Sequence, residues 1–108
     1  MKILSSYSNG KLTIFLQGEL DHHAAHETMN QISLGIEEYL PRDCVIDFSE
    51  LTFMDSSGIA IILKTHKKMA ETGGRATISN VPEQPLRVID ASGIDRIVTV
   101  LSPKEMKK

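Results

Sequence analysis

The chain has 108 residues, of which 41% are hydrophobic and 24% are charged, and this predicts one globular domain over residues 1–108. Twelve Lys and Arg against fourteen Asp and Glu leave a net charge of −2, which argues against binding to nucleic acid or to a membrane surface through positive charge. The single cysteine, Cys44, cannot form an intramolecular disulfide, and no apolar stretch suits a signal peptide or a membrane-spanning helix. We therefore expect a soluble, cytoplasmic protein.

The N-terminal part of the chain predicts a hairpin followed by a helix. Asn9-Gly10 tolerates positive φ at both positions and predicts a tight turn between strands over residues 2–7 and 12–17. In the second strand Leu12, Ile14 and Leu16 alternate with Thr13, Phe15 and Gln17. This period of two places the first three on one face. Apolar residues then recur at helical spacing at Ala25, Met29, Ile32, Ile36 and Leu40. Asp21 is placed to cap this helix and Pro41 to end it.

The rest of the chain alternates short strands with helices. Strands are predicted over residues 44–48, 76–78 and 97–100. Helices are predicted from the segment 55–58 to Gly73-Gly74, from Pro82 to Ser92 with Gly93 as its cap, and from the capping-box pattern that begins at Ser102. The order ββαβαβαβα predicts the α/β class, with a mixed, mostly parallel sheet, an N-terminal hairpin and about four helices.

The segment Asp55-Ser56-Ser57-Gly58 lies where the second helix begins. Ser56 is the natural N-cap, because its hydroxyl can accept a hydrogen bond from an amide of the first turn. A helix N-terminus is also the positive end of the helix dipole and suits an anion. A phosphoryl group on Ser56 would lie against those amides and add a charge of about −1.5 to −2 beside Asp55. Many helices begin with the same residue types and have no regulation, so the segment alone leaves a purely structural role open.

Two motifs together carry a family resemblance. Gly18-Glu19-Leu20-Asp21, extended by His22-His23, and Phe53-Met54-Asp55-Ser56-Ser57-Gly58 resemble the STAS-domain anti-sigma factor antagonists, with Ile59 where the family has Leu. The resemblance covers nearly the whole chain. It is closest to the sporulation-type antagonist of the sigma-F partner-switching system, while a general-stress type or another STAS regulatory module stays as the alternative.

The resemblance implies a STAS fold and a phosphorylation switch. The unphosphorylated protein would bind an anti-sigma factor that is also a Ser kinase and so release a sigma factor. That kinase would use ATP to phosphorylate Ser56, with Ser57 as the second choice, and a Ser phosphatase would reset the protein. Asp21 is expected beside Ser56, in contact with the kinase, and Asp55, Ser57 and Gly58 belong to the same contact surface. The chain itself would need no cofactor or metal and would be a monomer or a weak dimer.

Other readings of the sequence are less favoured. His22, His23 and His26 cluster, but they have no Cys partner and rarely make a closed zinc site, so surface or interface histidines are expected. A serine hydrolase would need a nucleophile elbow such as G-x-S-x-G, and Met54 stands where its first Gly would be. We therefore expect no enzyme activity. Further expectations are a partly buried His66, core packing for Met54 and Met69, and a solvated helix face for Lys64, Lys67 and Lys68.

Overall fold

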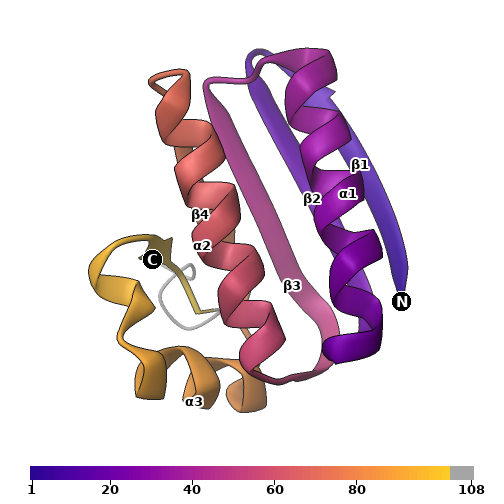
Figure 1. Ribbon diagram of the computed structural model, residues 1–108, viewed down its shortest axis with the longest axis vertical. Coiled ribbons are helices and arrows are strands. Elements are labelled where there is room, and N and C mark those ends of the chain that lie inside the picture. The colour runs from indigo at the N-terminus through magenta and orange to yellow at the C-terminus, as the bar shows by residue number, and fades with distance from the viewer. Residues whose placement is uncertain (103–108) are drawn as a thin grey trace.

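In the computed structural model, which describes residues 1–102, five strands form one mixed sheet in the order β1-β2-β3-β4-β5 (Figure 1). β1 (Lys2–Ser8) pairs antiparallel with β2 (Lys11–Leu20), and both Asn9 and Gly10 in the turn between them have positive φ. β3 (Asp43–Met54), β4 (Arg75–Ser79) and β5 (Thr99–Val100) then join in parallel. The predicted hairpin and the mixed, mostly parallel sheet are confirmed.

Three α-helices and one short 3-10 helix connect the strands within residues 1–102. α1 (His22–Tyr39) and α2 (Ser56–Glu71) lie side by side across one face of the sheet (Figure 1). α3 (Glu83–Ser92) lies where β3 ends and α2 begins, and η1 (Ile94–Arg96) leads into β5. The helix predicted from Ser102 onward falls almost wholly on residues 103–108, outside the described part. No helix of residues 1–102 is both long and apolar enough to cross a membrane.

The core lies between the sheet and the two long helices. Alternate residues of β2, β3 and β4 point into it because successive side chains of a strand face opposite sides. The sheet contributes the buried residues Leu12, Ile14, Leu16, Cys44, Ile46, Phe48 and Ile78, and the helices contribute Ile32, Ile36, Ile61, Ile62 and Met69. The predicted inward face of β2 and the core positions of Met54 and Met69 are confirmed, and His66 is half-buried as expected.

The largest departure from the predicted elements is the length of β3, which continues from Phe48 to Met54. Its register against β2 shifts twice, between Phe15 and Gln17 and between Gly18 and Glu19. Such irregularities break the strict alternation of buried and exposed residues by which a strand is recognised in a sequence. The prediction that this strand ends at residue 48 is therefore wrong: residues 49–54 are also strand.

Smaller corrections concern the ends of elements. Leu40 was expected in the buried stripe, but it is the left-handed C-cap of α1 (φ 47°) and 70% exposed. Pro82 is the N-cap of α3 and lies outside the helix. The last strand is limited to Thr99–Val100, because residues 94–96 form the 3-10 turn and Ile97 is its exposed C-cap. The ends of helices and strands depend on tertiary contacts, which the local periodicity of the sequence does not predict.

Candidate functional site: the edge where two helices begin

β2 and β3 end side by side, and each is followed at once by an aspartate and a helix. Leu20 is the register partner of Met54, and the Asp55 N–H donates to the Leu20 carbonyl at 3.3 Å. The Asp21 carboxylate accepts from the Ala24 N–H at 3.0 Å and caps α1. The N-termini of α1 and α2 therefore open at the same edge of the sheet (Figure 1). This arrangement puts Asp21 next to Asp55, the residue before Ser56, while any role for Asp21 in contacting a kinase stays a prediction.

The N-cap of α2 is Asp55, which corrects the assignment of that role to Ser56. The Asp55 carboxylate accepts from the Ser57 N–H at 2.8 Å, and Ser56 is the first helical residue. Asp and Ser cap helices about equally well, and a carboxylate gains in addition from the positive helix end. Ser56 is exposed, and its hydroxyl has no hydrogen-bond partner among residues 1–102. Its side chain is thus free for modification, whereas Ser57 is half-buried.

Gly58 allows Met54 to pack beneath the first turn of α2. A Cβ added at Gly58 would overlap Cγ and Sδ of Met54 and would lie 3.3 Å from Cδ2 of Leu20. Both Met54 and Leu20 are fully buried. A glycine is required here for close approach rather than for an unusual φ, because it lies within a regular helix. The last glycine of the motif is therefore explained by packing of the strand end against the helix.

Gln84 of α3 fixes the end of β3, a role that sequence patterns did not predict. Its amide oxygen accepts from the Met54 N–H at 2.9 Å, and its amide nitrogen donates to the Met54 carbonyl at 3.0 Å. The side chain thereby completes the backbone hydrogen bonding of Met54 as a neighbouring strand would. The two residues are 30 positions apart, and a single glutamine on a helix has no distinctive local pattern. Only an assembled fold identifies it.

Gly18 sets the end of β2 against β3. It has φ +114°, which a residue with a side chain rarely adopts, and it lies at the second register shift. The Thr52 hydroxyl donates to the Gly18 carbonyl at 3.0 Å and ties the irregular part of the two strands together. The glycine of the first motif thus brings Leu20, and with it Asp21, into line with Met54 and Asp55.

The other candidate residues occupy separate positions. The rings of His22 and His23 meet edge to face at 5.8 Å, and His26 lies 3.3 Å from Asn30. Across residues 1–102, no group of three or more His, Cys, Asp or Glu could hold a metal ion. Neither Ser56 nor Ser57 is hydrogen-bonded through its hydroxyl to a histidine or carboxylate in that range. Burial raises the pKa of the Cys44 thiol to about 12, and Cys44 lies in the core far along β3 from this edge.

Comparison with known proteins identifies the fold. A model of the STAS domain matches residues 4–106. This chain belongs to the STAS domain family. An anti-sigma F factor antagonist from Paenibacillus polymyxa is 31% identical to this STAS domain over 100 residues, which are 93% of this chain and 86% of the relative. The family resemblance predicted from the two motifs, and the fold that it implied, are confirmed.

Two solved structures resemble the STAS domain described above over almost its whole length. The anti-sigma factor antagonist SpoIIAA in its unphosphorylated form has a TM-score of 0.80 and 26% identity, with 97% of this chain and 92% of that chain covered. The Bacillus cell fate determinant SpoIIAA in its phosphorylated form has a TM-score of 0.70 and 28% identity, with coverage of 97% and 96%. The likeness includes the edge at which α1 and α2 begin, because the matches span the chain.

Proposed function

We propose that this STAS domain is an anti-sigma factor antagonist that is switched by phosphorylation of Ser56. In its unphosphorylated form it binds an anti-sigma factor that is also a Ser kinase, and so releases a sigma factor. The observation that carries the proposal is the position of Ser56: exposed, without a hydrogen-bond partner among residues 1–102, and first in α2 at the edge shared with α1. A relative named as an anti-sigma F factor antagonist supports the sigma-F type over the general-stress type.

The charges around Ser56 explain how a phosphoryl group would switch binding off. Asp55 and Asp21 already place two carboxylates at this edge. A phosphoserine adds a charge of about −1.5 to −2, and a partner that accepted a neutral hydroxyl would have to desolvate it. An uncompensated charge in an interface costs roughly 2–5 kcal/mol, about 30-fold to several thousand-fold in affinity. A phosphatase that removes the group restores binding.

The remaining residues of the motif have supporting roles in this proposal. Asp55 and Gly58 hold the first turn of α2 in place through the cap and the close packing on Met54. Half-buried Ser57 presents a small side chain to the partner, whereas Gly58 is buried and acts only through its packing on Met54. Asp21 contacts the kinase next to the hydroxyl that is phosphorylated. ATP is bound by the partner kinase, and this chain needs no cofactor of its own.

The test is phosphopeptide mapping with the anti-sigma factor kinase of the source organism and ATP. The protein, Ser56→Ala and Ser57→Ala are incubated side by side, and complex formation is measured by titration before and after the reaction. We expect phosphate on Ser56, its loss only in Ser56→Ala, and a complex that weakens at least 30-fold on phosphorylation. Phosphate on Ser57 alone would keep the function and move the site. An active kinase that neither binds nor modifies the protein would refute the proposal.

A further inference from the structure

A groove runs between α1 and α2 and begins at the edge where Ser56 lies. Its first part has a volume of about 460 Å³ and extends from His22 and Ser57 to Met29 and Lys64. A second hollow of about 280 Å³ is also lined by Met29 and Lys64 and continues along α2 to Glu71. Because the two hollows share these residues, they form one groove along the seam of the two helices. From Ser57 to Lys68 it follows α2 for roughly 16 Å, at 1.5 Å per helical residue.

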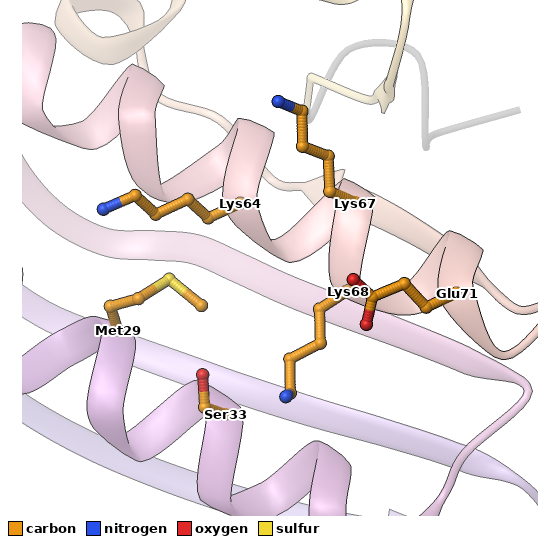
Figure 2. Close-up of a pocket in the computed structure, with 6 residues that line it drawn as sticks. All are labelled: Met29, Ser33, Lys64, Lys67, Lys68 and Glu71. Atoms are coloured by element: carbon orange, nitrogen blue, oxygen red, sulfur yellow. The ribbon is translucent and has the colours of Figure 1, made fainter.

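Lysine and histidine side chains line this groove, although the whole chain carries a net charge of −2. The groove is lined by His22, His26, Lys64, Lys67 and Lys68, against one acidic residue, Glu71. Figure 2 shows Lys64 and Lys68 on the side of α2 that faces Met29 and Ser33 of α1, whereas the Lys67 side chain points away from α1. Within residues 1–102, neither Lys64 nor Lys67 forms an ion pair.

Among residues 1–102 one ion pair bridges α1 and α2, and it is weak enough for Lys68 to change partners. Lys68 contacts Glu37 of α1 at 2.9 Å, but the Glu37 side chain is 61% exposed. Exposed pairs of this kind contribute about 0–1 kcal/mol, so another carboxylate can replace Glu37. The groove floor is less polar: Ala25 and Met29 are half-buried and Ile61 is buried. The groove therefore offers apolar contact below and ammonium groups along its α2 side.

We propose that this groove receives an acidic segment of the anti-sigma factor, a proposal that rests on the function proposed above. The occupant is a stretch that alternates apolar side chains with Asp or Glu, because these match the apolar floor and the lysines of the α2 wall. A partner that covers Ser56 already lies at the mouth of the groove, since Ser57 lines it. The same arrangement adds to the switch: a phosphoserine at the mouth repels the acidic segment that enters there.

Charge reversal of one lysine tests the groove directly. Lys64 is the best position, because it lines both hollows, is exposed and has no ion pair in the described part of the chain. The matched control is Lys11→Glu, which makes the same charge change on exposed Lys11 at the start of β2, the opposite end of that strand from Asp21. Thermal melts of both variants establish that the fold is kept.

The affinity of each variant, in its unphosphorylated form, for the anti-sigma factor is titrated at two salt concentrations. We expect Lys64→Glu to weaken the complex by about tenfold or more, Lys64→Gln to weaken it less, and Lys11→Glu to change it less than twofold. The salt dependence should be smaller for Lys64→Glu than for the unsubstituted protein. Equal effects of Lys64→Glu and Lys11→Glu, or no effect of either, would overturn the groove proposal. A complex between the unsubstituted protein and the anti-sigma factor would in that case still support the proposed function. Absence of any complex with the unsubstituted protein would refute both.

Discussion

Replacement of Gly58 by alanine should destabilise the protein, although alanine is the better helix former. The added Cβ would overlap Cγ and Sδ of Met54, and Met54 is fully buried with Leu20 beside it, so neither side chain has space to withdraw. Overpacking of this kind costs about 1–3 kcal/mol, while the gain in helix propensity over glycine is at most about 1 kcal/mol. We therefore expect a net loss of about 1–2 kcal/mol in the free energy of unfolding, measured by urea denaturation.

Gly35 provides the matched control for this experiment. It also lies within a helix and faces the sheet, but a Cβ there would be 3.1 Å from a single terminal methyl group, Cδ2 of Leu12. A small rotation of Leu12 relieves that contact at a cost of about 0.5–1.5 kcal/mol, which the gain in helix propensity of up to about 1 kcal/mol offsets. Gly35→Ala should therefore change stability by less than about 0.5 kcal/mol. In a Met54→Ala background the penalty of Gly58→Ala should disappear, with a coupling energy of about 1 kcal/mol or more. Additive effects of the two substitutions would refute the packing explanation.

Three further predictions concern residues around this edge and in the core. Gln84→Met should lower the free energy of unfolding by about 2–4 kcal/mol in urea titrations, because the N–H and carbonyl of buried Met54 lose both partners. Asp55→Ala should cost about 1–2 kcal/mol by the same assay, whereas Asp55→Asn keeps the cap and should cost a few tenths. Cys44 should resist a thiol reagent at pH 8 until denaturant is added. Burial raises the pKa of the Cys44 thiol from 9.0 to about 12, so the folded state favours the protonated thiol. The contribution of this group to the free energy of unfolding is therefore fully present below pH 9 and is lost as the pH rises from 9 to 12. Cys44→Ala should not show this part of the loss.

Local patterns in the sequence predicted the elements whose signals are local. The turn at Asn9-Gly10 follows from two residues that both tolerate positive φ. The inward face of β2 follows from the period of two along the strand. The N-cap of α2 was assigned to Ser56 instead of Asp55, because both residues offer an oxygen to amides of the first turn. The length of β3 was missed because its two register shifts interrupt the alternation. In both cases the local sequence is compatible with more than one structure, and only contacts in the assembled sheet select one of them.

The candidate site was predictable as a set of residues but not as an arrangement. The two motifs indicated Asp21 and the segment from Asp55 to Gly58. The structure shows that these lie close together, because Leu20 at the end of β2 pairs with Met54 at the end of β3. The bidentate contact of Gln84 was not predictable, since it joins residues 30 positions apart. Likewise, lysines on a helix normally indicate a solvated face. Only the neighbouring position of α1 shows that Lys64 and Lys68 line a groove.

The way this edge is held has a consequence for the proposed switch. Backbone bonding to Leu20, the amide of Gln84 and the Asp55 cap hold residues 54–57, and none of these bonds uses the Ser56 side chain. A phosphoryl group on Ser56 can therefore be added without breaking any of them. We therefore expect the two forms to differ chiefly in surface charge rather than in backbone structure. A switch of this kind acts on partner affinity in proportion to the charges that the partner brings, and its effect weakens as salt screens those charges.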